Sequence, residues 1–441
     1  MTVSRLHICL VSQQYGEVKS GIGVYTRNVA RKLLQDGHDV TLICPRERAV
    51  PDLPGIRLHP VSDARTGSSH IRWVALSRRF GRAIRQVLSG SRFDLIHFTD
   101  AREALFCRRM GIPLLGNMND YYFAAAPIAP WAFRRDYVDW LRRWGYYRLV
   151  HFLERRALRK LDTVICNSRH TAAVLRQAYR IPEHRLTVIY KSIDVKGAEA
   201  QTDQSEWGGG GAPRDPDGDA GTGSQEEGRQ KRPGREAGHG RGREVLFIGG
   251  NVQRKGLPTV IRAAPGILER FPETVFSVVG DNQNLDAMKA MCRREGVSDR
   301  FHFWGWQSHD QIQEHYRRAA VFVMPSLIEA FGLVFLEAMA AGVPVIGGDT
   351  GGTRELIQNG VNGCLVTPRD HHQLTGTIVR LFEDKALRQQ LIARGRRTVT
   401  QYTVEAMLRQ TYLLYQKQLG GESGPGAQTL DPGIPDKGAQ R

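Results

Sequence analysis

The sequence predicts an α/β protein made of two doubly wound parallel sheets. Short apolar runs alternate with helical patterns in both halves of the chain, and a long polar segment separates the halves. Strands that alternate with helices indicate parallel βαβ units, hence sheets covered on both faces. A chain of 441 residues is also long enough for two domains that each bury a core.

The first half begins with a strand and continues in βαβ order. Residues 24–37 carry apolar side chains at helical spacing and end at Gly37, which predicts the first helix. The first apolar run is too short for a signal peptide, and no run of about 18 apolar residues follows. We therefore expect a cytoplasmic chain, at most peripheral on the inner face of the cytoplasmic membrane. The predicted strands are 6–12, 39–45, 93–98, 112–118, 163–168 and 186–190.

A break in composition at 197–243 divides the two halves. The segment is rich in Gly and charge and has almost no apolar residues, so burial cannot offset the entropy of ordering it. We expect a disordered insert. Its acidic residues between Asp215 and Glu226 resemble a calcium loop only faintly, because Ala220 stands where that loop needs glycine, and we expect no calcium there.

The alternation restarts after the insert. We expect an N-terminal domain over 1–196, a second α/β domain over 244–400, a helix over 401–420 that packs back on the first domain, and a disordered tail over 421–441. The strands predicted for the second half are 244–250, 274–280, 300–306, 320–326, 343–349 and 363–368.

Cysteine usage and charge narrow the class of protein. Six cysteines without CxxC spacing favour reduced core residues over a zinc site or disulfides. The net charge of +17 suits phosphate-rich ligands, anionic membranes or nucleic acid. Part of this positive charge lies in 131–161, which contains nine Arg or Lys and only three acidic residues. The interleaved aromatics Trp131, Phe133, Tyr137, Trp140 and Trp144 fit either an interfacial helix on anionic lipid or a core helix with a solvated basic face.

The strongest functional signal lies in 325–347. A strand is followed by a glycine turn, and a nearly apolar helix runs from about Gly332 to Gly342. Glu337 in that helix needs a hydrogen-bonding partner, which a ribose diol could supply. Glu329 precedes the helix, whose N-terminus suits a phosphate. The segment therefore predicts an anion site flanked by two carboxylates that bind hydroxyl groups.

A second signal lies in 248–264. A strand ends in glycines, and Arg254 and Lys255 stand just before a helical pattern. Two cations at such a turn can hold a diphosphate, arginine as a fork and lysine as a point charge. A solvated basic loop is the plainer alternative, and the presence of both signals in one half favours the diphosphate.

These segments resemble retaining glycosyltransferases of the GT-B fold, family 4, the glycogen-synthase-like group. The resemblance is carried by EAFGLVFLE (329–337), AGVPVI (341–346), GGTRELIQNGVNGCLV (351–366) and the RKG turn (254–256). It covers nearly the whole chain except 197–243 and the C-terminal tail. It implies two Rossmann-like domains that face each other across a cleft.

The resemblance also implies roles for particular residues. Glu329 would contact the donor sugar and Glu337 the ribose diol, while Arg254 and Lys255 would neutralise the leaving diphosphate. Backbone N–H groups at Gly332 and Leu333 would assist, and Trp306 and Gln307 in the WGWQ turn would border the base. The glycine-rich segment KSGIGVYTRNVA (19–30) would let Gly21 and Gly23 approach the donor phosphates or the acceptor, unless it is a plain strand-to-helix turn.

Two departures from the family pattern affect the site. Many relatives carry an arginine where this chain has Gly250, and many carry a histidine before an aspartate where it has Asn119 and Asp120. Asn119 could hydrogen-bond a sugar on the acceptor side but cannot act as a histidine would. Asp120 is retained as a candidate catalytic residue.

The implied reaction transfers a sugar from a nucleoside diphosphate to a saccharide or lipid-linked acceptor, with retention, in cell-envelope glycan synthesis. Positive protein groups could replace a metal, so we expect metal-independent catalysis without a cofactor. One rival is a sugar-nucleotide 2-epimerase of the same fold. Another is a nucleic-acid binder, but no recognisable binding module supports it, and we expect no nucleic-acid partner. The base, uridine or guanosine, stays open.

Overall fold

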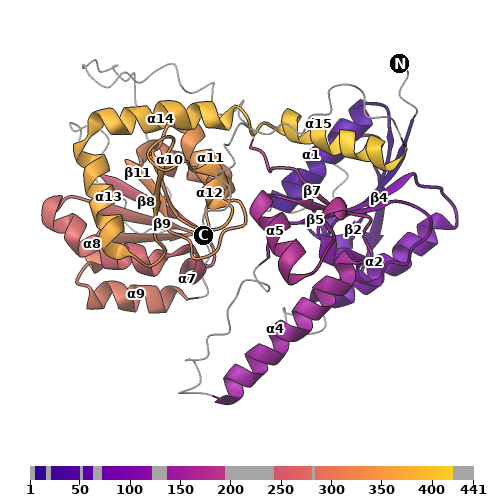
Figure 1. Ribbon diagram of the computed structural model, residues 1–441, viewed down its shortest axis with the longest axis horizontal. Coiled ribbons are helices and arrows are strands. Elements are labelled where there is room, and N and C mark those ends of the chain that lie inside the picture. The colour runs from indigo at the N-terminus through magenta and orange to yellow at the C-terminus, as the bar shows by residue number, and fades with distance from the viewer. Residues whose placement is uncertain are drawn as a thin grey trace, which may run out of the picture.

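The computed structural model describes residues 5–15, 21–49, 53–62, 72–121, 137–193, 243–280 and 284–420, and within these the side chains of 137–144 are not described. Two α/β bodies lie side by side (Figure 1). The predicted insert at 197–243 lies outside the described residues except for Arg243, and so do the calcium-like residues within it and the tail at 421–441.

The N-terminal body is built on a seven-stranded parallel sheet in the order β3-β2-β1-β4-β5-β6-β7. Its strands are β1 (His7–Val11), β2 (Asp39–Pro45), β3 (Arg57–Val61), β4 (Leu95–Phe98), β5 (Leu114–Met118), β6 (Thr163–Cys166) and β7 (Leu186–Val188). Its α-helices are α1 (Gly21–Gln35), α2 (Arg72–Leu88), α4 (Tyr137–Leu158) and α5 (Arg169–Ala178). Among the described residues, short 3-10 helices occur at η1 (Arg46–Arg48), η2 (Ala101–Phe106) and η4 (Glu183–Arg185).

The C-terminal body has a six-stranded parallel sheet in the order β10-β9-β8-β11-β12-β13. Its strands are β8 (Glu244–Ile248), β9 (Val275–Val279), β10 (Phe301–Gly305), β11 (Val321–Met324), β12 (Val345–Gly348) and β13 (Cys364–Val366). Its helices are α7 (Val252–Lys255), α8 (Leu257–Arg270), α9 (Leu285–Arg294), η5 (Ser298–Arg300), α10 (His309–Arg318), α11 (Leu333–Ala340), α12 (Thr353–Leu356), α13 (His371–Glu383) and α14 (Lys385–Val399).

Burial explains why these runs form central strands. The strands β2, β4, β5, β6, β8, β11 and β12 are buried along nearly their whole length, as expected of parallel sheets covered by helices on both faces. All strands predicted from the sequence are present, with ends that differ by up to two residues. The additional strand β3 was not predicted. It pairs only with β2, at the edge of the sheet.

The last helix, α15 (Val404–Gln418), returns to the N-terminal body, where Figure 1 shows it as the yellow helix beside α1. Met407, Leu414 and Tyr415 are buried in the same apolar cluster as β1 and β2, whereas Val399 and Tyr402 belong to the core of the C-terminal body. The chain therefore crosses between the bodies just before α15. The segment that leaves the N-terminal body after β7 runs beside this connection, because Ile193 N donates to Tyr402 O at 3.1 Å.

All six cysteines are free, and five of them are buried. In the described part of the chain, no helix is both long enough and apolar enough to traverse a bilayer.

Candidate active site

The candidate site lies where the strand order of each sheet reverses. In the C-terminal sheet, β8 and β11 are neighbours, and the chain leaves them toward opposite edges. In the N-terminal sheet, β1 and β4 stand in the same relation. Ligands of doubly wound sheets bind outside the carboxyl ends of the strands at such switch points. The turns after β8 and β11 carry the residues that the sequence singled out.

The turn after β11 ends in a bare helix N-terminus. Gly332 adopts φ +95° at the N-cap of α11, a conformation that favours glycine, and it offers no side-chain cap. The first N–H groups of the helix, beginning at Leu333, lack intrahelical acceptors by geometry. Phe335, Leu336, Ala338 and Met339 anchor the helix in the core. The fold therefore places an uncapped helix N-terminus, of the kind that can bind an anion, at the switch point.

The turn after β8 packs against the turn after β11. The short helix α7 ends at Gly256, with φ +87°, and a Cβ there would clash with the carbonyl oxygen of Pro325. Leu327 N donates to Arg254 O at 2.8 Å, and the Arg254 guanidinium donates to Ile328 O at 3.4 Å. Glycine thus permits the close approach that brings both cations of the RKG turn beside Glu329.

Lys255 and Glu329 form an ion pair inside this junction. The Lys255 ammonium donates to Glu329 Oε2, and the two side chains are only 16% and 8% exposed. Ser326 Oγ lies 3.5 Å from the same oxygen. Because a buried ion pair is favourable only when both partners are present, each side chain fixes the position of the other. The structure therefore joins Arg254, Lys255, Glu329 and Gly332 in one site.

Glu337 has a protein partner that the sequence analysis did not identify. The Tyr316 hydroxyl, from α10, lies 3.1 Å from Glu337 Oε2. Burial raises the pKa of Glu337, and the Tyr316 hydrogen bond offsets part of that shift. The side chain is half-buried, so the other carboxylate oxygen can accept from a ligand. Tyr316 lies on another helix, 21 residues earlier in the chain, so no pattern in the sequence of α11 predicts that it is the partner of Glu337.

The predicted base-binding residues lie at the same edge of the sheet but farther out. Trp306 and Gln307 follow β10, which is separated from β11 by β9 and β8. The Trp306 side chain is 50% exposed. The Gln307 amide turns back and donates to Trp304 O at 2.9 Å. Of these two residues, Trp306 presents the larger accessible surface for a planar base.

The N-terminal domain faces this site with the start of α1. Gly21 opens the helix, and Gly23 is buried within its first turn. A Cβ on Gly21 would lie 3.7 Å from Leu333 Cδ1, so the starts of α1 and α11 meet across the two domains. Residues 16–20, which include Lys19 of the predicted glycine-rich segment, lie outside the described residues.

Asn119 and Asp120 follow β5 at the same edge of the N-terminal sheet. Asn119 Nδ2 donates to Thr99 O at 2.9 Å, and Asn119 O accepts from Asn167 Nδ2 at 2.9 Å. The Asn119 amide therefore ties the loops after β4 and β5 together. Asp120 is partly exposed, and its Oδ2 lies 3.9 Å from Arg102 Nη2.

Arg102 is a site residue that the sequence analysis missed. It forms a bidentate pair with buried Asp100 at 2.6–3.1 Å and lies 3.7 Å from buried Glu154. Asp100 and Glu103 form a capping box on η2, and Glu103 also accepts from Gln13 N at 2.7 Å. Burial raises the pKa of Glu103, and Asp100 adds to that shift. The Asp-x-x-Glu spacing of Asp100 and Glu103 is typical of a capping box, and it was the sequence pattern that could have indicated this cluster.

Lys191 is the second missed residue. It lies in the segment that leaves the N-terminal domain, and burial lowers its pKa while Asp120, Asp100 and Glu329 act against that shift. Its ammonium therefore shares the field of carboxylates from both domains. A lysine at the end of a short apolar run gives no sequence signal of this placement.

Two hydrogen-bonded contacts join the domains around the site. The Tyr121 hydroxyl donates to Glu329 O at 3.0 Å. Glu355, on α12, accepts from Arg169 N at 2.8 Å, from His170 N at 2.6 Å and from the Tyr190 hydroxyl at 3.0 Å. A carboxylate of one domain thus caps the first turn of α5 in the other, where negative charge is favourable.

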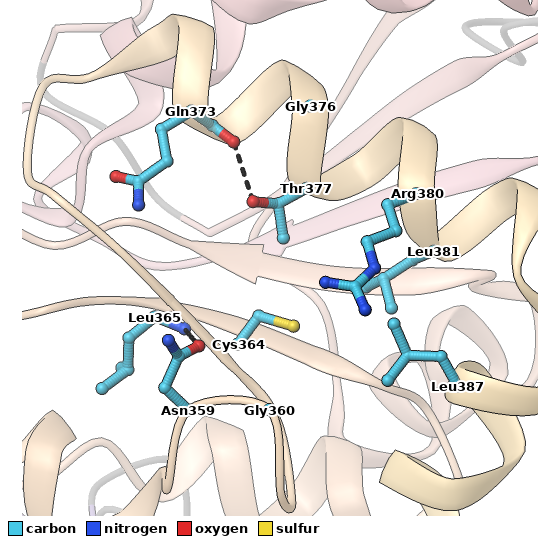
Figure 2. A pocket seen from close by; sticks show the side chains of 10 residues that line it. All are labelled: Asn359, Gly360, Cys364, Leu365, Gln373, Gly376, Thr377, Arg380, Leu381 and Leu387. Carbon is cyan, nitrogen blue, oxygen red and sulfur yellow. Dashed lines mark hydrogen bonds between the residues drawn. The ribbon is translucent and has the colours of Figure 1, made fainter.

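A separate cavity of about 360 Å³ lies between α13, α14 and β13 (Figure 2). Its polar groups bond to each other or to the chain, because Asn359 Oδ1 accepts from Leu365 N and the Thr377 hydroxyl donates to Gln373 O. It contains none of the predicted site residues. We assign no function to it.

The fold defines a GT-B protein, with a cluster of two cations, a carboxylate and a helix N-terminus at the switch point of its second domain. Two families match the chain, Glycosyltransferase Family 4 over residues 19–196 and Glycosyl transferases group 1 over residues 230–398. The chain belongs to the family 4, group 1 glycosyltransferases of the GT-B fold. The matched ranges correspond to the two bodies of the structure.

Individual relatives agree with this family. An uncharacterized glycosyltransferase of Methanocaldococcus jannaschii is 32% identical over 39% of this chain and 44% of its own length. A GDP-mannose-dependent alpha-(1-6)-phosphatidylinositol monomannoside mannosyltransferase of Mycobacterium tuberculosis is 33% identical over 35% of this chain and 42% of its own length. These alignments span less than half of either relative. A D-inositol 3-phosphate glycosyltransferase of Nocardiopsis dassonvillei is 27% identical over 88% of this chain and 87% of its own length.

Solved structures share the fold. Sucrose-phosphate synthase from Thermosynechococcus elongatus matches with a TM-score of 0.71 and 21% identity, over 94% of this chain and 100% of that one. The Anabaena protein HepE, in complex with UDP and glucose, matches with a TM-score of 0.63 and 18% identity, over 92% of this chain and 98% of that one. The parallel sheets of both bodies are thus a known architecture.

Proposed function

We propose that the protein transfers a sugar from a nucleoside diphosphate sugar to a saccharide or lipid-linked acceptor, with retention of the anomeric configuration. The observation that carries the proposal is the junction of Arg254, Lys255 and Glu329 with the bare N-terminus of α11. Two cations and a helix dipole point to a doubly charged ligand, and a carboxylate beside them points to hydroxyl groups.

The diphosphate would lie on Gly332 and Leu333, between the starts of α11 and α1. Arg254 and Lys255 would then stabilise the charge that develops on the departing phosphate oxygen, which is usually the largest contribution to such catalysis. Because Lys255 is already held by Glu329, it is oriented before the donor binds. Glu329 would accept from the sugar hydroxyls once Lys255 shifts toward phosphate.

The nucleoside would extend from the diphosphate along the C-terminal domain. Glu337 would accept from the ribose diol with the oxygen that Tyr316 leaves free. Trp306 offers an exposed aromatic face for the base. Gly21 and Gly23 would close the site from the other domain.

In the bond changes that we propose, the bond between the anomeric carbon and the phosphate oxygen breaks. The acceptor oxygen attacks the same face, and its proton passes to the leaving diphosphate. Asp120 and Arg102 line the acceptor side, with Asn119 holding their loop. Because Arg254, Lys255 and the helix N-terminus supply positive charge, we propose that transfer needs neither a metal ion nor a cofactor.

The relatives support the choice of donor and acceptor classes. One is named for GDP-mannose and a phosphatidylinositol acceptor, another for an inositol phosphate acceptor, and HepE binds UDP. We therefore propose a nucleoside diphosphate hexose and a polar or lipid-linked acceptor, as in cell-envelope glycan synthesis. The free cysteines fit a reducing, cytoplasmic compartment.

The test measures binding and product separately. A thermal-shift screen with UDP, GDP and their sugars should raise the melting temperature for one base, because a ligand of the native state stabilises it. Incubation of that donor with saccharide and lipid acceptors should release nucleoside diphosphate only when an acceptor is present, and the product should keep the donor's anomeric configuration. Release without any acceptor, together with a 2-epimeric sugar, would identify an epimerase instead. No shift with any nucleotide would overturn the proposal.

A further inference from the structure

A second pocket, of about 500 Å³, lies on the N-terminal domain at the C-terminal end of α4. Its volume falls within the range of roughly 300–1,000 Å³ that is typical of small-molecule sites. One wall is the segment that leads into β5, and the other is α4 with the turn after it. The lining residues are Cys107, Arg108, Arg109, Phe152, Arg155, Arg156, Arg159 and Lys160.

The pocket lies at the opposite end of the domain from the candidate active site. Residues 107–109 precede β5, and Lys160 precedes β6, so both walls are at the amino edge of the parallel sheet. Gly21, Asn119 and Asp120 follow strands at the carboxyl edge. Lys160 Nζ donates to Cys107 O at 2.7 Å and joins the two walls. A ligand here is therefore not part of the donor site.

The pocket carries six cations and no acidic residue. Within the described part of the chain, none of these six side chains forms an ion pair with a carboxylate, and Arg155 Nε is buried without a hydrogen-bond partner. Such a concentration of unneutralised charge around a concavity favours an anion. The guanidinium groups of Arg108, Arg109, Arg155, Arg156 and Arg159 suit a phosphate, which they can hold with two hydrogen bonds each.

The rim of the pocket is apolar and exposed. Leu149 is 52%, Phe152 60% and Phe106 38% exposed, and these are three of the six large hydrophobic side chains exposed in the described residues. At 100° per residue, Leu149, Phe152, Arg155 and Arg156 fall within about 120° of arc on α4, and Arg159 directly follows the last residue of the helix. Val150, Ala157 and Leu158 are buried on the other side. The outer face of this part of α4 thus mixes basic and apolar side chains.

We propose that the pocket binds the phosphate of an anionic phospholipid headgroup, with Phe152 and Leu149 inserted among the neighbouring lipids. A soluble anion would be stabilised by the cations alone, whereas binding to a lipid surface would also bury the exposed apolar side chains of the rim. The proposal goes beyond sugar transfer and stands without it. The side chains of 131–144, on which the interpretation of 131–161 as an interfacial helix depends, lie outside the described residues and play no part in this proposal.

The position of α4 relates this contact to the cleft. The helix runs from the carboxyl edge of the sheet to the amino edge, and Figure 1 shows its first part projecting beyond the rest of the N-terminal domain. A helix of 22 residues is about 33 Å long. If its outer face lies on a membrane, the cleft edge of the domain is held near the same surface, where a lipid-linked acceptor would be.

The test is flotation of the full chain with phosphatidylcholine vesicles, with and without phosphatidylglycerol. Wild type should float only with the anionic vesicles. The double variant Arg156→Gln/Arg159→Gln should bind them about 30-fold more weakly, since each basic residue near an anionic surface contributes about five-fold. A matched control, Arg394→Gln/Arg397→Gln on the exposed face of α14, loses the same charge and should bind as wild type does. Phe152→Ser should remove the binding that persists at high salt.

Three outcomes would overturn the lipid assignment. They are equal weakening by both double variants, flotation of wild type with phosphatidylcholine alone, and a thermal shift with inorganic phosphate that only Arg156→Gln/Arg159→Gln loses. The last would identify a site for a free anion. The nucleotide-induced thermal shift should persist in every variant, which verifies folding and separates failure of this proposal from failure of the proposed sugar transfer.

Discussion

Tyr121 of the N-terminal domain donates its hydroxyl hydrogen to the backbone carbonyl of Glu329 at 3.0 Å, so the carboxylate proposed to bind the sugar is tied to the opposite domain. The same carbonyl accepts from Gly352 N at 2.8 Å. Burial raises the pKa of Tyr121, and the Glu329 charge adds to that shift. The phenol therefore stays protonated and remains a donor. This hydrogen bond therefore ties the position of the Glu329 backbone to the placement of the N-terminal domain.

Tyr121→Phe should lower kcat/KM about five-fold while leaving nucleotide binding unchanged. The substitution keeps the ring and removes one hydrogen bond, which contributes about 1 kcal/mol. Steady-state kinetics with a thermal-shift titration of the nucleotide would measure both. Tyr412→Phe is the control, because its hydroxyl bonds to His38 on the far side of the domain. Equal kcat/KM for wild type and Tyr121→Phe would show that the contact has no catalytic effect.

Lys255→Met should be strongly destabilising as well as inactive. It leaves Glu329 buried without its partner, and breaking a buried pair costs about 3–5 kcal/mol. Lys255→Met/Glu329→Gln should recover most of that free energy of unfolding without recovering turnover, because two of the proposed donor contacts are gone. Urea denaturation and a transfer assay would separate the two effects. A double variant as unstable as Lys255→Met would mean that the pair is not coupled.

The arrangement of each sheet follows from local patterns, whereas the contacts between the domains do not. Buried central strands such as β8 and β11 appear in the sequence as continuous apolar runs. The missed strand β3 contains Arg57, His59 and Pro60, residues that an edge strand tolerates because one of its sides is unpaired.

The carboxylates and cations at the switch point could be predicted because each stands at a strand end or a helix start. Tyr121, Lys191 and Glu355 could not, because each interacts with residues of the other domain. Their partners are brought close by the relative placement of two folded bodies. No spacing along the chain encodes that placement.

Glu337→Gln should stabilise the fold at neutral pH. Burial raises the pKa of Glu337 above its ordinary value of 4.5, so the native state prefers the protonated carboxyl, and the ionised form costs stability as the pH rises through the shifted pKa. Gln is neutral at every pH. The difference in melting temperature should therefore be largest near pH 7 and should vanish as the pH falls toward 4.5.

The same substitution should weaken nucleoside diphosphate binding, since an amide replaces the carboxylate that we propose to accept from the ribose. Deoxynucleoside diphosphates provide the control, because they lack one hydroxyl of the diol and should discriminate less between wild type and variant. Gain of stability with unchanged nucleotide affinity would remove Glu337 from the donor site.

His97 should make the docking of α15 sensitive to acid. Its ring is buried between the Tyr415 hydroxyl, at 2.6 Å, and Asn117 Oδ1, at 2.9 Å. Burial lowers its pKa from 6.5 to about 4, so the native state holds the neutral ring. The stability is fully present above pH 6.5 and is lost as the pH falls toward 4, by about 3 kcal/mol at most. Urea denaturation between pH 7.5 and pH 4.5 should show this slope, and His97→Gln should reduce it. His372→Gln, an exposed change on α13, should leave the slope as in wild type. A slope that His97→Gln leaves intact would assign the acid sensitivity to other groups.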